Sequence, residues 1–249
     1  KELYEKATNL KEIYTPAAGN DWVPDDPSRK VDVTYGTFHG TMMAESLIGN
    51  ILYFNHRTPT MVSRQKEHHW DRGAQSGITL LKDQTVLIIG YGNIGRACAQ
   101  LLIPFGCHVI GMKRSVSSSI DELGVECTTP EHIESALEQA DHVVLILPSG
   151  NATDGFFKKE YFTFMKKSAI LHNIGRGNAV TSESLVWALE DEIIAGAAID
   201  VFEVEPLPKE SPLWDLKNIF ITPHSTCVFE NYKSEFYFEL RDALNERIE

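Results

Sequence analysis

The stretch that decides the fold is Thr85-Val-Leu-Ile-Ile-Gly-Tyr-Gly-Asn-Ile-Gly-Arg96. It begins with β-branched and apolar residues, as in a strand buried on both faces, and residues 94–105 have the pattern of a helix. Between them, Gly90, Gly92 and Gly95 form G-x-G-x-x-G. Such glycines allow a tight turn, a close approach of the backbone to a pyrophosphate, and close packing of helix on strand, while the first N–H groups of the helix face the phosphates. The glycines alone would also fit a simple turn, but the flanking strand and helix predict dinucleotide binding.

The composition excludes several classes of protein. The 249 residues can bury one large core or two smaller ones, and 43% hydrophobic and 23% charged residues are usual for a globular fold. A net charge of −12 argues against nucleic acid or an anionic membrane as the main partner, and no apolar run is long enough to span a bilayer. The cysteines at 98, 107, 127 and 227 show no close pairing. They predict reduced thiols in a cytoplasmic protein without a metal site.

Strand and helix patterns alternate from residue 85 to residue 222, which is typical of a parallel, doubly wound α/β sheet of the Rossmann type. The expected strands are 10–14, 31–34, 85–89, 107–112, 143–147, 169–173, 195–200 and 219–222. The expected helices are 39–56, 63–72, 94–105, 131–139, 161–165, 182–190 and 230–248, with Pro59 ending the first of them. Ligands of such sheets bind beyond the carboxyl ends of the strands. Arg176, Asp200, Glu205 and His224 all follow strands, so we expect them to converge on one site.

The residues after the second strand of the nucleotide-binding unit bear on the choice of cofactor. An NAD-binding unit carries a carboxylate about 20 residues past the glycines, where it accepts the ribose 2′-hydroxyl. Here that position holds Lys113, followed by Arg114 and Ser115. Cations there would attract a 2′-phosphate, so the sequence favours NADP over NAD. The alternative interpretation is a solvated basic turn with a weak preference for NAD.

The residues after the strand ends suit carbonyl reduction by a nicotinamide cofactor. Reduction needs a proton on the carbonyl oxygen, and histidine, which titrates near neutrality, is the natural donor. A carboxylate on the far ring nitrogen fixes the tautomer, and the planar fork of arginine matches a substrate carboxylate. His224, Glu205 and Arg176 fit these roles. Taken singly, each also fits a structural histidine, a surface turn or a structural ion pair.

Longer motifs resemble a known family. They are Gly90-Tyr-Gly-Asn-Ile-Gly-Arg96, Asn173-Ile-Gly-Arg-Gly177, Gly196-Ala-Ala-Ile-Asp-Val-Phe-Glu-Val-Glu-Pro206, Ser211-Pro-Leu-Trp214 and Thr222-Pro-His-Ser225. Their order and spacing are similar to those of the D-isomer-specific 2-hydroxyacid dehydrogenases across nearly the whole chain. The resemblance implies a nicotinamide-dependent oxidoreductase acting on a small 2-oxo or 2-hydroxy acid, with no nucleic acid or membrane partner. It also implies a homodimer, formed in part by the long helix that begins at His39.

The resemblance assigns roles to single residues. Arg176 would bind the 2-oxo acid, Glu205 and His224 would form the acid–base pair, and the backbone of Ala18 and Gly19, in the loop 17–21, would meet the substrate carboxylate. Asp200 would hold the nicotinamide carboxamide. The complete set of candidate cofactor contacts is Gly90, Tyr91, Gly92, Asn93, Ile94, Gly95, Lys113, Arg114, Ser115, Leu147, Pro148, Asn173, Ile174, Gly175 and Asp200.

The chain departs from the family pattern at three places. The usual opening strands and helices do not precede Leu10, so we expect a substrate domain that is incomplete in this sequence or unusually small. Lys113 replaces the acidic residue, as in members similar to NADP-dependent glyoxylate and hydroxypyruvate reductases, and the loop 21–30 is long and broken by prolines. The expected division is a partial substrate domain at 1–37, a dinucleotide-binding domain at 38–224, and a helix at 225–249 that returns to the substrate domain.

These observations favour an NADP-preferring reductase of small 2-oxo acids such as glyoxylate or hydroxypyruvate. A second hypothesis, from another class, is an NAD(P)H-sensing protein similar to the corepressors that share this fold, with little turnover. A third is oxidation of formate or phosphite, but the pair of Glu205 and His224 fits a hydroxyacid enzyme better than the Gln–His pair of formate dehydrogenases.

Overall fold

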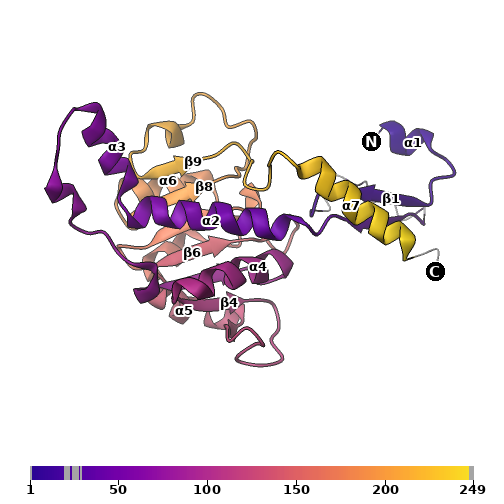
Figure 1. Cartoon of the computed structure of the whole chain (residues 1–249), viewed down its shortest axis with the longest axis horizontal. Helices are drawn as coiled ribbons and strands as arrows, with labels where there is room; N and C mark the ends of the chain where they lie inside the picture. The colour runs from indigo at the N-terminus through magenta and orange to yellow at the C-terminus, as the bar shows by residue number, and fades with distance from the viewer. Residues whose placement is uncertain (1, 20–22, 24–27, 29, 247–249) are drawn as a thin grey trace.

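A seven-stranded sheet forms the larger of two parts of the molecule (Figure 1). The computed structural model describes residues 2–19, 23, 28 and 30–246. All neighbouring strands of this sheet pair in parallel, in the order β5-β4-β3-β6-β7-β8-β9. The strands are β3 (Thr85–Ile89), β4 (His108–Met112), β5 (Glu126–Thr128), β6 (His142–Leu145), β7 (Ile170–Asn173), β8 (Gly196–Ile199) and β9 (Ile219–Ile221). The strand order reverses between β3 and β6, so the predicted doubly wound sheet is confirmed, with its switch point beside the glycine turn.

Helices cover both faces of this sheet. On one face, α2 (His39–Asn55) and α4 (Asn93–Leu102) pack on each other and on Val86 and Ile88 of β3. On the other face, α5 (Ile133–Gln139) and α6 (Ser182–Glu190) cover Leu87 and Ile89. The strand residues therefore alternate between two apolar cores, as burial on both faces requires. Short 3₁₀ helices lie at Arg72–Gln75, Leu81–Asp83, Ile103–Phe105, Pro130–His132, Lys159–Phe164, Gly177–Ala179 and Pro212–Asp215.

The smaller part contains α1 (Glu2–Lys6) and a parallel pair of strands, β1 (Glu12–Thr15) and β2 (Asp32–Tyr35). The last helix, α7 (Tyr232–Asn245), lies beside this pair although it is far away in the sequence (Figure 1). The Thr37 N–H donates to Glu239 Oε1 at 2.9 Å, and the Tyr232 hydroxyl donates to the Pro16 carbonyl at 3.1 Å. The return of the terminal helix to the first residues is thus visible, while the assignment of these segments as a substrate domain stays a prediction.

Several predicted boundaries were wrong. Pro59 does not end the long helix: α2 stops at Asn55, and Pro59 lies in the first turn of α3 (Thr58–Lys66), where its missing N–H costs nothing. The helix expected at 63–72 therefore begins at Thr58 and ends at Lys66. The edge strand β5 was not predicted because its three residues carry no apolar run. Most of the proline-rich loop 21–30, and the end of the helix expected at 230–248, lie outside the described residues.

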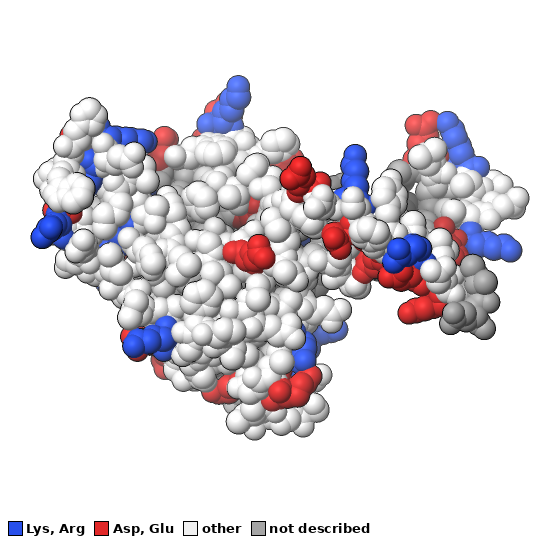
Figure 2. Space-filling view, viewed as in Figure 1, with Lys and Arg blue, Asp and Glu red and all other residues white. Residues whose placement is uncertain are grey.

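The surface carries both signs of charge. On the face seen in Figure 2, lysine and arginine side chains stand singly or beside acidic ones and do not form a continuous basic patch. In the described part of the chain, no helix is both long enough and apolar enough to cross a membrane. All four cysteines are described, and each is free.

Candidate active site

A cavity of about 640 Å³ lies at the carboxyl ends of the central strands, where the two parts of the molecule meet. Ten of the predicted site residues line it, namely Ala18, Gly19, Ile94, Leu147, Pro148, Ile174, Gly175, Arg176, Asp200 and His224. They come from the small part, from α4 and from the loops after β6, β7, β8 and β9. Asn20 and Asp21, at the end of the predicted substrate loop, lie outside the described residues.

The glycine turn has the shape that a pyrophosphate needs. Gly90 has φ 101, and a Cβ there would lie 2.3 Å from the Ile146 carbonyl oxygen, so only glycine fits. A Cβ on Gly92 would meet no protein atom within 4 Å, which leaves the space above the turn open. Gly92 is also the N-cap of α4 and offers no side-chain hydrogen bond. The first N–H groups of α4, from Asn93 onward, therefore face this space without partners inside the helix, and the turn fits a dinucleotide.

Two predicted cofactor residues have buried side chains with structural roles. The Tyr91 ring lies against Gly111, where a Cβ would approach it to 2.5 Å, and its hydroxyl donates to Asp121 at 2.8 Å. The Asn173 amide donates to the Arg176 carbonyl at 3.0 Å and accepts the N–H of residue 175 at 3.2 Å. Neither side chain lines the cavity. Both residues shape the turns that carry the site, and their assignment as cofactor contacts stays a prediction.

The basic residues predicted to choose the cofactor follow β4, the strand next to β3. Lys113 is partly buried, its N–H donates to Thr128 at 3.1 Å, and its Nζ lies 5.9 Å from the centre of the Tyr91 ring. Arg114 and Ser115 are exposed. The carboxyl ends of β3 and β4 are adjacent, so these three residues lie at the same end of the sheet as the glycine turn.

Glu205 and His224 form a hydrogen-bonded pair. The His224 Nδ1 lies 2.8 Å from Glu205 Oε2, and Glu205 Oε1 accepts the Phe202 N–H at 2.9 Å. An ionised carboxylate only accepts, so this contact places a proton on Nδ1 and leaves Nε2 for another partner. His224 has φ 51, in the left-handed region that costs free energy for a branched-chain or ring residue. The backbone is thus held in an unfavourable conformation that directs this side chain.

Asp200 supports the loop that carries His224. The carboxylate is 3% exposed and accepts hydrogen bonds from the Thr222 hydroxyl at 2.5 Å, the Ser225 N–H at 2.8 Å and the Thr226 N–H at 3.0 Å. The His224 N–H donates to the Asp200 carbonyl at 2.8 Å. Asp200 therefore fixes the histidine loop, a role that the sequence did not predict, while it also lines the cavity.

A second histidine, His39, lines the same cavity but is unsuited to proton transfer. It is 2% exposed, its Nε2 lies 3.2 Å from the Tyr232 hydroxyl, and its Nδ1 is buried with no hydrogen bond to a described residue. Burial lowers the pKa of His39, although Glu239 opposes the shift. His39 is therefore neutral at pH 7, which leaves His224 as the acid–base candidate.

Arg176 lies in the turn after β7. Its Nη1 donates to the Gly175 carbonyl at 2.9 Å, and the side chain is partly buried in the wall of the cavity. A guanidinium in such a wall can bind a carboxylate through two N–H groups. His224 and Arg176 thus place an imidazole and a guanidinium around one space.

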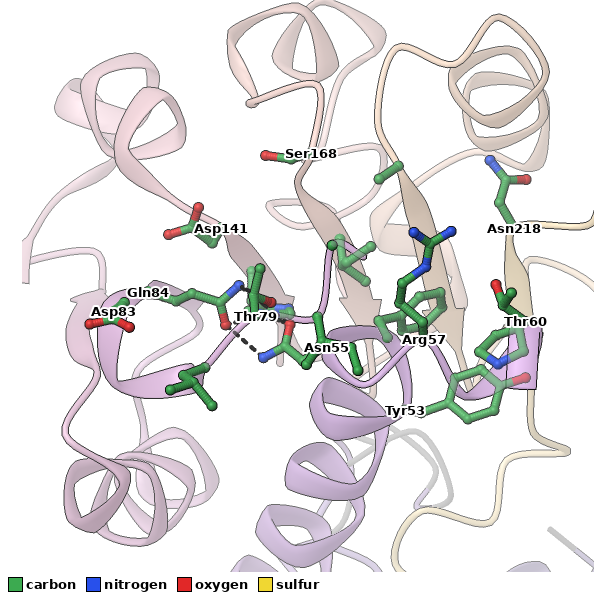
Figure 3. Close-up of a pocket in the computed structure, with 18 of the residues that line it drawn as sticks. Tyr53, Asn55, Arg57, Thr60, Thr79, Asp83, Gln84, Asp141, Ser168 and Asn218 are labelled. Atoms are coloured by element: carbon green, nitrogen blue, oxygen red, sulfur yellow. Dashed lines mark hydrogen bonds between the residues drawn. The ribbon is translucent and has the colours of Figure 1, made fainter. Parts of the chain in front are cut away.

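A larger cavity, of about 830 Å³, lies at the opposite end of the sheet (Figure 3). It is bounded by the end of α2 and by the residues that precede or begin the strands, among them Asp141 and Asn218. Asn55 and Gln84 are hydrogen-bonded to each other there, at 2.6 and 3.3 Å. Parallel sheets bind ligands at the carboxyl ends of their strands, so we assign the active site to the smaller cavity. The described residues include no cluster of side chains suited to a metal ion.

Sequence comparison identifies the family. The model of the D-isomer specific 2-hydroxyacid dehydrogenase NAD-binding domain matches residues 48–226, and the chain belongs to this family. It is 33% identical over 229 residues to glyoxylate/hydroxypyruvate reductase B of Enterobacter sp., an alignment covering 89% of this chain and 70% of the relative. It is 31% identical over 228 residues to D-3-phosphoglycerate dehydrogenase of Methanocaldococcus jannaschii, covering 90% and 43%.

Solved structures agree with this assignment. The fold matches that of an NADPH-dependent glyoxylate/hydroxypyruvate reductase of Sinorhizobium meliloti in complex with NADP and sulfate, with a TM-score of 0.87 and 28% identity. That match covers 99% of this chain and 78% of the other. The chain spans less than half of the length of several relatives, namely 43%, 49% and 41%.

Some residues that line the cavity were not predicted. They include Thr15, Pro16 and Ile146, and also His39, Met43, Thr226, Cys227 and Tyr232. Thr226 and Cys227 directly follow the predicted motif at 222–225, so their position after the last strand was a usable signal. His39, Met43 and Tyr232 reach the cavity from α2 and α7, and their spacing in the sequence carries no such signal.

Proposed function

We propose that the protein reduces small 2-oxo acids, such as glyoxylate or hydroxypyruvate, to 2-hydroxy acids of D configuration, with NADP as the preferred cofactor. The observation that carries the proposal is the 2.8 Å contact between His224 and Glu205 at the cavity that Arg176 also lines. The glycine turn beside this cavity, and the names of the relatives, support the same reaction.

In the proposed mechanism His224 is the acid. A nicotinamide dinucleotide held at Gly90, Gly92 and the first turn of α4 would supply the hydride. The His224 Nε2 gives a proton to the carbonyl oxygen. The C=O double bond becomes a C–O single bond with new C–H and O–H bonds, and the 2-oxo acid becomes a 2-hydroxy acid. Throughout, Glu205 accepts a hydrogen bond from the His224 Nδ1–H, and its negative charge stabilises the imidazolium that is present before the transfer. His224 then regains a proton from solvent.

Arg176 and the loop from the small part orient the substrate. The guanidinium binds the substrate carboxylate or the polarised carbonyl oxygen, where its charge stabilises negative charge that develops as the hydride arrives. The backbone N–H groups of Ala18 and Gly19, which belong to the small part and also line the cavity, bind the substrate carboxylate. Together they hold the carbonyl carbon in one orientation, which gives a product of one configuration.

The preference for NADP rests on Lys113, Arg114 and Ser115. Two cations and a hydroxyl follow β4, at the position where NAD-binding units carry a carboxylate. A 2′-phosphate would receive charge-assisted hydrogen bonds there. The predicted homodimer and cytoplasmic location stay predictions.

The test is turnover by the protein with NADPH and NADH in parallel, using glyoxylate, hydroxypyruvate, pyruvate and bulkier 2-oxo acids. We expect faster turnover with NADPH and with the small acids. A faster rate with NADH would contradict the cofactor preference and leave the chemistry in place. Tight binding of both cofactors without turnover of any acid would contradict the reductase and favour an NAD(P)H sensor.

A further inference from the structure

The loop after β4 is held at its base and open at its tip. Lys113 at its start donates to Thr128 of β5, and the Cys127 N–H of the same strand donates to the Ser119 carbonyl at 2.8 Å. Residues 114–120, which include Arg114 and all four serines of the loop, are exposed. The groups proposed to bind a 2′-phosphate thus lie on an exposed segment whose position depends on how its base is anchored.

Asp121 anchors that base to the glycine turn. Its Oδ2 accepts the Tyr91 hydroxyl at 2.8 Å and Arg96 Nη1 at 3.0 Å. Its Oδ1 accepts the backbone N–H groups of Leu123 at 2.9 Å and Val125 at 3.0 Å. The side chain is 7% exposed, so one carboxylate joins the end of the loop to the second residue of the glycine pattern and to the first turns of α4.

These contacts keep the carboxylate charged and the geometry fixed. Burial alone would raise the pKa of Asp121, but the hydrogen bonds from Tyr91 and from the two backbone N–H groups, with the charge of Arg96, bring that pKa below its ordinary value. Removing one partner of a buried, charged hydrogen bond leaves the other unsatisfied, so the arrangement resists rearrangement.

Tyr91 links this anchor to the proposed phosphate site. Its ring fills the space above Gly111 in β4, and Lys113 Nζ lies 5.9 Å from the ring centre, within the range of a cation–π contact. Its hydroxyl donates the hydrogen bond to Asp121. Lys113 and Asp121, the two ends of the loop, therefore rest on one aromatic side chain that the glycine turn carries.

We propose that Asp121 is a positioning residue for discrimination between NADP and NAD. It holds the 113–120 loop in the conformation in which the cations and hydroxyls of this loop converge on a 2′-phosphate, without touching the cofactor itself. The inference rests on the proposed NADP preference and names the contact that builds it.

The test replaces one carboxylate oxygen of Asp121 with an amide NH₂ group. Asp121→Asn keeps Oδ1 as the acceptor for Leu123 and Val125 but replaces Oδ2 with an NH₂ group, which cannot accept from Tyr91 or Arg96. Glu122→Gln is the matched control, since Glu122 is exposed and also pairs with Arg96. Calorimetry measures the Kd of NADPH and of NADH for each variant, and thermal unfolding checks that each is folded.

We expect the Kd of NADPH to rise about tenfold in Asp121→Asn, while the Kd of NADH changes less than twofold. A rise of about tenfold is typical when some of the hydrogen bonds to a charged group are lost. Glu122→Gln should change neither. If Asp121→Asn unfolds, Tyr91→Phe, which removes only the hydroxyl, should give the same selective loss on a smaller scale.

Equal losses for both cofactors, or none, in a protein that prefers NADPH would overturn the inference and leave the proposed function standing. A wild-type protein that binds NADH as tightly as NADPH would overturn both the inference and the cofactor preference. Selective loss of NADPH binding in a protein without turnover would support the inference and contradict the reductase.

Discussion

Both ends of the parallel sheet carry histidines, but in opposite environments. At the carboxyl end, the His224 side chain is 38% exposed and is held by Glu205. His142 is the first residue of β6 and His172 is the third residue of β7. They are 1% and 0% exposed, and the Nδ1 of the first lies 3.1 Å from the Nε2 of the second. Burial lowers the pKa of His142 to about 4 and that of His172 well below its ordinary value. The buried pair is neutral at pH 7, whereas the His224 side chain is accessible and lines the cavity.

The comparison shows that a histidine is assigned to chemistry by its access and its partner, and not by its number of hydrogen bonds. The His142 Nε2 contacts Asn55 at 3.2 Å and Gln84 at 3.3 Å, so the buried network has more partners than the exposed one. Its partners are neutral amides, which satisfy a buried ring without stabilising a charge on it. The following predictions test this contrast.

The largest effect is expected at the exposed histidine. His224→Gln keeps a polar side chain but cannot donate a proton at neutral pH, so kcat should fall by about 10²–10⁴, the usual contribution of a positioned acid. The Kd of NADPH and the unfolding temperature should stay unchanged. Steady-state kinetics and calorimetry on the same sample measure both, and near-normal turnover would remove His224 from the mechanism.

Arg176 should come next. Arg176→Gln removes the fixed positive charge, and kcat/KM for the 2-oxo acid should fall by about 10²–10³, as for loss of one oxyanion-stabilising donor. Arg176→Lys should recover only part of the loss because an ammonium cannot form the two parallel hydrogen bonds of a guanidinium. Full activity in the lysine variant would show that charge alone suffices and that the planar fork is not used.

At the amino end, the expected effect is on stability. His142→Phe keeps a ring of similar size but removes the groups that face Asn55 and His172, so the free energy of unfolding should fall by about 1–3 kcal/mol. Chemical denaturation measures this loss. Turnover per folded molecule should equal that of the wild type, and a large drop in kcat would mean that the buried network takes part in catalysis.

The last prediction concerns acid stability. At pH 7.5 His142 is neutral in both the folded and the unfolded chain, whereas below its ordinary pKa of 6.5 only the unfolded chain binds the proton. The free energy of unfolding should therefore fall as the pH drops from 6.5 toward the folded pKa of about 4. Denaturation curves at several pH values test this, and His142→Phe should show a shallower fall. An equal slope in both proteins would assign the acid sensitivity to other groups.

The parts of the fold that depend on neighbouring residues were predictable. Thr85–Ile89 and Ser182–Glu190 have the predicted bounds, and the sign of φ at Gly90 follows from its place in the turn. Contacts between segments far apart in the sequence were not predictable. Asp121 is 30 residues from Tyr91, and Asp200 is 22 residues from Thr222, so no local pattern joins them. Glu205 and His224 could be proposed as a pair from their motifs, but only the folded chain brings their side chains to 2.8 Å.

The most direct test of the account is a double-mutant cycle on Glu205 and His224, with kcat for a small 2-oxo acid and NADPH as the readout. If the two residues act as one acid–base unit, Glu205→Gln should lower kcat by about 10–10²-fold, and the double variant should be no slower than His224→Gln alone. If the reduction of kcat in the double variant equals the product of the two single reductions, the residues act independently and the account is contradicted.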